Sequence, residues 1–209
     1  MTKKPGKFIT VEGCEGVGKS TQIALLKEYC AAQKIDAVFT REPGGTPIAE
    51  RVRSVILDPN CVGMDALTEL FLYAAARRQH TQEFILPSLQ AGKTVFCDRY
   101  TDSTLAYQGY GRGIDKDIIR TLNTWALAEV QISRTLFIDV NPRDGFLRKG
   151  GRDLSDRLEN ESIEFHERVY EGFCAIAAEE PNRVLRLDGS GTAQQVFSRI
   201  LSALNAEKS

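Results

Sequence analysis

The sequence predicts an α/β fold in which helices cover both faces of a five-stranded parallel sheet. Two observations carry this prediction: five short, almost continuously apolar segments, and longer segments of helical periodicity between them. Such alternation is typical of βαβ units, and continuous apolar strands indicate a sheet buried on both faces, which makes three layers. The chain has 209 residues, so we expect residues 1–209 to form a single domain.

The individual elements follow from these patterns in chain order. The expected strands are residues 8–11, 37–40, 94–97, 135–139 and 184–187. A first helix is expected at about residues 20–33, and a second runs to about residue 57. Asp65 can cap a long helix that Gly92 closes, with a kink or an end near Pro87. Further helices are expected at about residues 115–129, with Trp125 and Leu127 in the core, at about 161–178, and at the end of the chain.

Composition and charge exclude several classes of protein. With 42% hydrophobic and 26% charged residues, the chain does not resemble a disordered, collagen-like or coiled-coil protein. A formal net charge of −1 argues against nucleic acid as the main partner. No apolar run approaches the ~18 residues of a membrane span, and no signal-peptide core follows the first lysines. The five cysteines lack CxxC spacing and are odd in number, which indicates reduced thiols in a cytoplasmic protein.

A phosphate-binding motif follows the first strand. Residues 13–20 read GCEGVGKS and match GxxxxGK[ST], between a predicted strand and a predicted helix. We therefore expect a P-loop NTPase fold, with Lys19 reaching the β- and γ-phosphates of ATP and Ser20 ligating Mg²⁺. The residues expected to bind the nucleotide are Gly13, Cys14, Glu15, Gly16, Val17, Gly18, Lys19, Ser20 and Thr21.

The P-loop alone does not define the reaction. GTPases carry a base-reading NKxD sequence late in the chain, and this chain has none. Residues 188–191 match DxxG, but they follow the last strand, which is the wrong place for a switch loop, so we interpret them as a turn. Motor ATPases usually need much longer chains. A kinase that acts on a small metabolite fits the length.

Later motifs resemble those of bacterial thymidylate kinases. REPGGT at residues 41–46, DRY at 98–100 and LAYQG at 105–109 stand in the order of that family, and YAAAR at 73–77 resembles its aromatic-to-arginine helix segment. The polar stretch that ends at residues 156–159 resembles its lid, and the similarity covers about residues 7–205. The resemblance implies transfer of the γ-phosphate of ATP to dTMP, giving dTDP for dTTP biosynthesis, with Mg²⁺ and in a homodimer.

The resemblance also assigns the acceptor side of the site. Tyr73 and Arg77 are four residues apart on a predicted helix and therefore share one face. Tyr73 matches the stacking aromatic of the family, normally phenylalanine, and Thr104 and Gln108 match residues that read the thymine edge. The arginines matched to the acceptor phosphate are Arg53, Arg77 and Arg99. From spacing alone, core or surface roles would be favoured for all of these side chains.

Acidic residues are expected around the phosphates. Glu15 matches an acid near the acceptor sugar, and Glu42 matches an acid close to the acceptor and the metal. Asp98 ends an apolar strand like a Walker-B acid and is expected to hold Mg²⁺ through water. The resemblance also suggests a cis bond between Glu42 and Pro43.

The lid, at about residues 148–157, should supply a cation to the transition state, because the P-loop itself carries no arginine. Arg148, Arg152 and Arg157 are available, and Gly150 and Gly151 are plausible hinges. Arg152 matches a lid arginine of the family, and we expect it to be catalytic together with Lys19, Glu15 and Arg99, although the choice among the three lid arginines stays open.

Two alternatives remain at this stage: a kinase for another acceptor, and a nucleotide-binding module without turnover. The Tyr73–Arg77 pair and the Thr104/Gln108 segment argue against an acceptor that is not a nucleotide. His80 and His166 show no metal-ligand pattern, so we expect them to be structural or on the surface.

Overall fold

The computed structural model describes residues 6–151, 153 and 155–205, and its strands form one parallel sheet in the order β2-β3-β1-β4-β5. The strands are β1 Phe8–Glu12, β2 Ala37–Arg41, β3 Thr94–Asp98, β4 Arg134–Asp139 and β5 Val184–Asp188. All five predicted strands are confirmed. The chain passes from the β2–β3 half to the β4–β5 half across β1, so the carboxyl ends of the central strands outline the switch point where open α/β sheets bind ligands.

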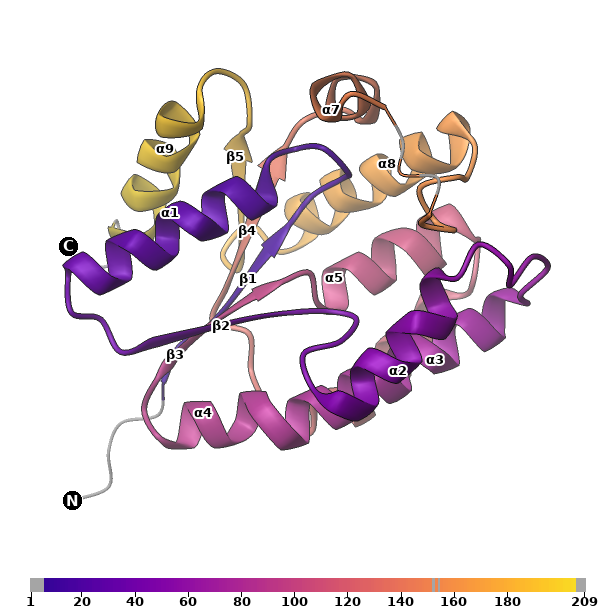
Figure 1. Ribbon diagram of the computed structural model, residues 1–209, viewed down its shortest axis with the longest axis horizontal. Helices are drawn as coiled ribbons and strands as arrows, with labels where there is room; N and C mark the ends of the chain where they lie inside the picture. Colours follow the sequence, from indigo (N-terminus) through magenta and orange to yellow (C-terminus); the bar gives the residue numbers. More distant parts are fainter. Residues whose placement is uncertain (1–5, 152, 154, 206–209) are drawn as a thin grey trace.

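Helices cover both faces of this sheet, which confirms the predicted three layers (Figure 1). On one face lie α1 Lys19–Ala32 and α9 Ala193–Asn205, which contact each other. On the other lie α4 Leu86–Gln90, α5 Thr101–Thr104 and α8 Ile163–Glu179. Two further helices, α2 Pro47–Leu57 and α3 Ala66–His80, pack against each other, and α3 also contacts α6 Lys116–Leu127.

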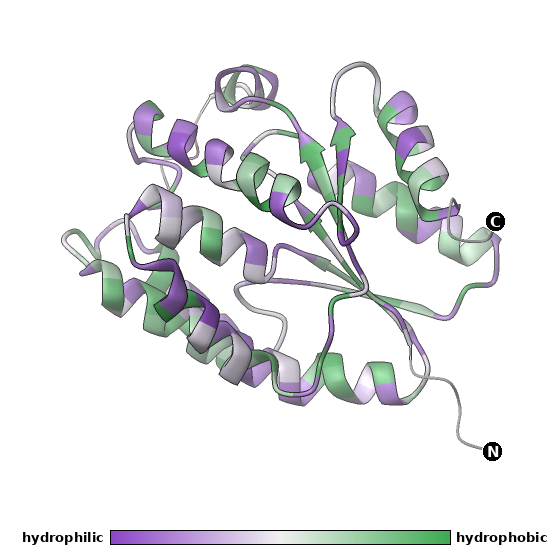
Figure 2. Ribbon diagram, turned by 180° about the vertical axis from the view of Figure 1, so that it is seen from behind, coloured by the Kyte–Doolittle hydropathy of each residue, from purple (hydrophilic) through white to green (hydrophobic). Residues whose placement is uncertain are grey.

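The hydrophobic core lies on both sides of the sheet. Ile9 and Phe96 belong to a cluster with Leu26 of α1, whereas Phe8 packs with Ile85 and Tyr100 on the opposite side. In Figure 2 hydrophobic runs follow the strands, while the helices mix hydrophobic and hydrophilic turns. Among the described residues, no helix is both long enough and apolar enough to cross a membrane.

The long helix predicted after Asp65 exists, but it changes its winding before Pro87. Asp65 caps α3 by accepting hydrogen bonds from the Leu67 and Thr68 amides at 3.0 and 3.2 Å. A π-helical segment, η1 Thr81–Ile85, then joins α3 to α4. Proline lacks an amide hydrogen and disturbs the preceding turn of a helix, and the wider π turn accommodates it without ending the helical run.

Two helical segments were not predicted from the sequence. Residues after β3 form α5 and then η2 Leu105–Gly111, where π winding and glycines leave no 3.6-residue apolar period. The other is α7 Pro142–Lys149, whose Asn141 cap, first-turn proline and left-handed Gly150 are recognisable start and stop signals.

The prediction that Trp125 is a core residue is wrong. Its side chain is 69% exposed, whereas Leu127 is partly buried as expected. The buried stripe of α6 runs through Ile119, Asn123 and Ala126, and Trp125 projects to the side of that stripe.

Candidate active site

The P-loop connects β1 to α1 at the switch point of the sheet. Gly18 has φ 96° and precedes the first helical residue, Lys19. Gly16 has φ 72°, and a Cβ there would lie 1.9 Å from the Gly145 carbonyl oxygen of α7, so only glycine allows α7 to approach the loop so closely. The Lys19 ammonium donates to the carbonyl oxygens of Gly13 and Cys14 at 3.0 and 2.7 Å.

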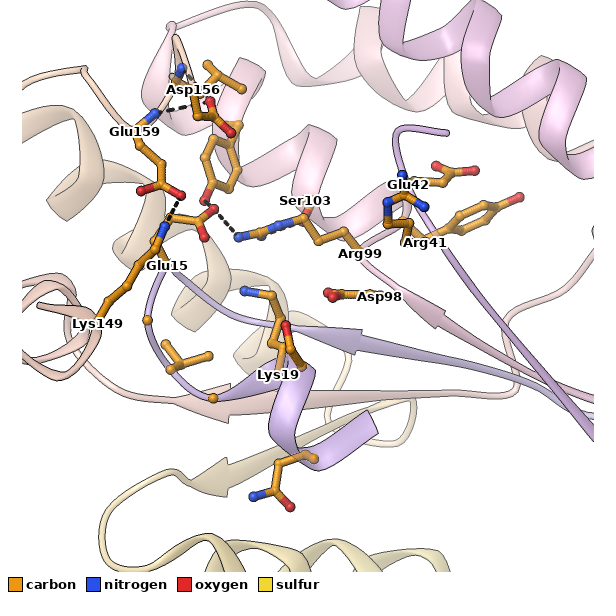
Figure 3. A pocket seen from close by; sticks show the side chains of 18 of the residues that line it. Glu15, Lys19, Arg41, Glu42, Asp98, Arg99, Ser103, Lys149, Asp156 and Glu159 are labelled. Carbon is orange, nitrogen blue, oxygen red and sulfur yellow. Dashed lines mark hydrogen bonds and ion pairs between the residues drawn. The ribbon is translucent and has the colours of Figure 1, made fainter. Parts of the chain in front are cut away.

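A cavity of about 650 Å³ opens above the P-loop and collects most of the predicted site residues. Figure 3 shows Glu15, Lys19, Asp98 and Arg99 pointing into it from different elements. The predicted residues that line it are Glu15, Gly16, Val17, Gly18, Lys19, Ser20, Thr21, Glu42, Arg53, Tyr73, Arg77, Asp98, Arg99, Thr104 and Gln108. Of the predicted nucleotide-binding residues, Gly13 and Cys14 are not in the lining, and the Cys14 side chain is buried in the core.

Arg99 stands at the centre of the cavity, immediately after β3, with the left-handed φ of 64°. Its Nη2 donates to Glu15 Oε1 at 2.5 Å, and its Nη1 donates to the Gly13 carbonyl oxygen at 2.9 Å and to Ser103 Oγ at 3.1 Å. Burial alone would raise the pKa of Glu15, but the charges of Arg99 and Lys19 outweigh burial and lower it to about 2. Glu15 is therefore ionised at neutral pH, and Arg99 is fixed in place.

A buried carboxylate lies beneath Arg99. Glu12, the last residue of β1, accepts hydrogen bonds from the Tyr100 amide at 2.7 Å and from Ser103 Oγ at 2.6 Å. Burial and the nearby Asp102 raise the pKa of Glu12 to about 7. Ser103 thus links the Glu12 carboxylate to the Arg99 guanidinium, a connection that no sequence motif indicates.

Arg77 is held by a chain of buried polar contacts. Its Nε donates to Glu42 Oε2 and its Nη1 donates to Asn123 Oδ1, both at 2.7 Å. The other Glu42 oxygen lies 2.9 Å from His80 Nδ1, and His80 Nε2 lies 2.7 Å from Thr40 Oγ1. Among the described residues these bonds engage two of the three guanidinium nitrogens, so Nη2 is the nitrogen that could bond to a nucleotide in the cavity. His80, expected to be structural or on the surface, is fully buried.

The remaining acceptor-side residues also converge on the cavity. Arg53 Nη1 donates to the Pro43 carbonyl oxygen at 2.8 Å, and the Glu42–Pro43 peptide bond is cis, as the resemblance suggested. Thr104 Oγ1 and Gln108 Oε1 are buried side-chain atoms of the lining that have no hydrogen-bond partner among the described residues. Buried polar atoms normally have partners, so a ligand in the cavity could supply the missing partners of these two.

A divalent cation could be held next to the P-loop. The described residues contain no cluster of three or more acidic, histidine or cysteine side chains that could bind a metal by themselves. Mg²⁺ at phosphate sites needs only one or two protein ligands, because phosphate oxygens and water complete its octahedron. Asp98 Oδ1 is buried without a hydrogen-bond partner in the part of the chain that the structure describes, and Ser20 lies across the same cavity, so the two predicted ligands fit such an ion.

The three candidate arginines of the predicted lid differ in what the structure shows of them. Arg157 is anchored, because its Nη2 lies 2.5 Å from Glu69 Oε2 and its Nε donates to the Ile56 carbonyl oxygen at 2.9 Å. Arg148 lines the cavity and donates to the Gly189 carbonyl oxygen at 2.8 Å. Arg152 lies outside the described residues.

Several further side chains, not predicted from the sequence, line the cavity. Lys149 forms an ion pair with Glu159 (Figure 3). Glu159 also accepts a hydrogen bond from the Asp153 amide at 2.8 Å. Tyr107 packs against Arg99, and the guanidinium carbon lies 5.2 Å from the centre of the Tyr107 ring. Tyr107 belongs to the LAYQG motif and could have been proposed from it, whereas nothing in the sequence pairs Lys149 with Glu159.

This chain is similar to known thymidylate kinases in sequence and in fold. The family model described as thymidylate kinase matches residues 11–200. A thymidylate kinase of Desulforapulum autotrophicum is 46% identical over 95% of this chain and 90% of its own length, and one of a Synechococcus species is 49% identical over 94% of each. The crystal structure of a thymidylate kinase from Ehrlichia chaffeensis superposes with a TM-score of 0.79 at 37% identity, covering 96% of this chain and all of that one. This chain belongs to the thymidylate kinase family.

Proposed function

We propose that the chain transfers the γ-phosphate of ATP directly to the phosphate of dTMP, with both nucleotides bound in the cavity above the P-loop. The observation that carries this proposal is the meeting, in one cavity, of a phosphate-binding loop with the arginines and unpartnered polar atoms of an acceptor site. The donor phosphates would lie on the P-loop amides, with Lys19 moving from the Gly13 and Cys14 carbonyls to the phosphates.

The acceptor would occupy the other half of the cavity. Tyr73 stacks on thymine, Thr104 and Gln108 bond its edge, and arginines bind the monophosphate. Arg99 is best placed for the phosphate, because it lies between the P-loop and the acceptor side, and Arg53 and Arg77 line the same space. Glu15, ionised and bonded to Arg99, would orient the sugar or the arginine that touches the reacting phosphates.

Ser20 and Asp98 would hold Mg²⁺, Asp98 through water. When bound, the ion neutralises charge on the donor phosphates. No covalent intermediate is needed, since both nucleotides would lie in the same cavity beside Arg99 and the phosphate would pass directly between them.

Residues 148–157 would form a lid that excludes water and so limits hydrolysis of ATP. We assign the transition-state cation to Arg152, in line with the family match. The anchoring of Arg157 on Glu69 supports this assignment, because a cation held by a buried carboxylate is poorly placed to reach a phosphate.

A homodimer and a cytoplasmic location belong to the same proposal. Leu67 and Phe71 of α3 are 43% and 55% exposed, and α3 contacts α6, which carries the exposed Ile118 and Trp125. An apolar surface of this kind suits a second copy of the chain. Sedimentation of the wild type and of Phe71→Asp should give a dimer and a monomer, respectively. All five cysteines are free thiols, which supports a reducing compartment.

The first experiment measures ADP release from ATP and Mg²⁺ with dTMP, dUMP, dCMP, AMP or no acceptor. We expect strong stimulation by dTMP, well above every other nucleotide. Equal turnover with another acceptor would leave the P-loop assignment intact but refute the acceptor pocket. Binding of ATP without stimulation by any acceptor would point to a non-catalytic module.

A further inference from the structure

Glu69 is a fully buried carboxylate of α3 that lies behind the base end of the cavity and is not part of its lining. Its Oε1 accepts a hydrogen bond from Gln108 Nε2 at 2.9 Å. Both oxygens also accept bonds from Arg112, at 3.2 and 3.0 Å, and Oε2 lies 2.5 Å from Arg157 Nη2. Burial alone would raise the pKa of Glu69, but the bonds from Arg112, Gln108 and Arg157 hold it below its usual range.

An ionised carboxylate can only accept hydrogen bonds, so the group of Gln108 that faces Glu69 must be the amide NH₂. The orientation of the Gln108 amide is therefore fixed, because only its NH₂ group can donate to the carboxylate. Its carbonyl oxygen, Oε1, is left on the cavity side as a buried acceptor that no described residue satisfies. A glutamine free to turn would present a donor or an acceptor equally well, and this one presents an acceptor.

We propose that Glu69 is a positioning residue that sets the base specificity of the acceptor site by holding the Gln108 carbonyl oxygen toward the base. The inference rests on the proposed function. Thymine and uracil carry a hydrogen on ring nitrogen N3 and can donate to this oxygen. Cytosine has a lone pair at N3 and meets it with repulsion. Glu69 thus excludes cytosine nucleotides without touching them, while the choice between thymine and uracil depends on the methyl group and not on Glu69.

The test compares kcat/KM for dTMP, dCMP and dUMP in the wild type and in Glu69→Gln, with calorimetric binding of each nucleotide in the absence of ATP as a second readout. The amide that this substitution introduces can donate as well as accept, so the Gln108 amide is released to turn. We expect the preference for dTMP over dCMP to fall by about 10- to 100-fold, which corresponds to one or two misdirected hydrogen bonds. The preference for dTMP over dUMP should stay within about twofold.

Arg112→Gln is the matched control, because it removes bonds to the same carboxylate and spares the contact with Gln108. It should lower the melting temperature and leave both preferences unchanged. If Glu69→Gln does not fold, Glu69→Asp keeps the charge but withdraws it from Gln108, and the same shift is expected. A folded variant with an unchanged dTMP-to-dCMP preference, or one that loses both preferences equally, overturns the inference. A wild type that does not phosphorylate dTMP refutes the proposed function itself.

Discussion

The cavity has an acceptor half, which contains Arg77, and a lid half, which contains Lys149. The partners of these two cations come from different distances along the chain. On the acceptor side, Arg77 is 2% exposed and bonded to Glu42 and Asn123, and the three side chains come from separate parts of the chain. On the lid side, Lys149 pairs with Glu159 ten residues along the chain, with the lysine about one third exposed. Arg77 is thus bonded to partners from distant parts of the chain, whereas Lys149 is paired with a residue close to it in sequence.

We propose that the lid half, and not the acceptor half, rearranges during catalysis. A braced arginine loses little entropy when a phosphate arrives, and preorganised charge is what stabilises a transition state. A cation paired within its own segment can exchange its partner for a phosphate without disturbing the sheet. We therefore expect substitutions of lid residues other than the anchored Arg157 to act mainly on turnover. Substitutions in the buried contacts of Arg77 with Glu42 and Asn123, which we call the brace, should act mainly on stability.

The largest effect is expected in the lid. Replacing Arg152 by alanine should lower kcat by about 10³- to 10⁵-fold, because a cation that reaches the γ-phosphate in the transition state contributes that much. Single-turnover rates with dTMP would measure it. Arg157→Ala is the comparison, since Arg157 is anchored on Glu69, and it should cost stability more than turnover. A greater loss of kcat in Arg157→Ala than in Arg152→Ala would reverse the assignment.

The brace is tested by Glu42→Ala. Removing this carboxylate leaves the buried Arg77 charge without its ion-pair partner, so the free energy of unfolding should fall by about 3–5 kcal/mol. Urea unfolding measures the change. Arg143→Ala serves as the control, because Arg143 pairs with Glu167 at the surface, with side chains 65% and 40% exposed, and should cost less than about 1 kcal/mol. Equal losses in both variants would show that burial does not distinguish the two pairs.

Glu12, the buried carboxyl group bonded to Ser103 and the Tyr100 amide, should make stability depend on pH. Its pKa in the folded protein is raised to about 7 by burial and by Asp102, whereas Ser103, Arg99 and the Tyr100 amide act in the opposite direction. A raised carboxyl pKa means that the folded state binds the proton more tightly, so this contribution is present below pH ~4.5 and is lost as pH rises through about 7.

Glu12→Gln cannot titrate at this position and should escape that loss. Between pH 5 and pH 8 the wild type should lose on the order of 1–3 kcal/mol relative to the variant, a difference in which the titration of groups remote from Glu12 cancels. Urea unfolding of both proteins at four pH values checks it. Parallel stability curves would show that Glu12 does not change its protonation in this range.

Much of the sheet and of the P-loop could be predicted because their signals are local. Continuous apolar runs indicated the strands, and a phosphate loop is one short stretch of sequence. The segment at residues 101–111 was missed because π turns do not repeat every 3.6 residues. The partners of the site could not be predicted either. Asn123 is 46 residues from Arg77, and Glu69 is 39 from Gln108, so only the folded chain brings them together.

The smallest predicted effect concerns the cap of α3, the helix that carries Glu69, Tyr73 and Arg77. Asp65→Ala removes the hydrogen bonds to the first-turn amides and should cost about 1 kcal/mol of stability. The KM for dTMP should not change, because α3 is positioned by the buried bonds of Glu69 and Arg77 and not by the exposed cap residue Asp65. Thermal unfolding and steady-state kinetics measure the two quantities on the same preparation. A KM for dTMP raised tenfold or more would mean that the buried bonds of Glu69 and Arg77 do not fix the position of α3. The cap at Asp65 would then be what positions this helix.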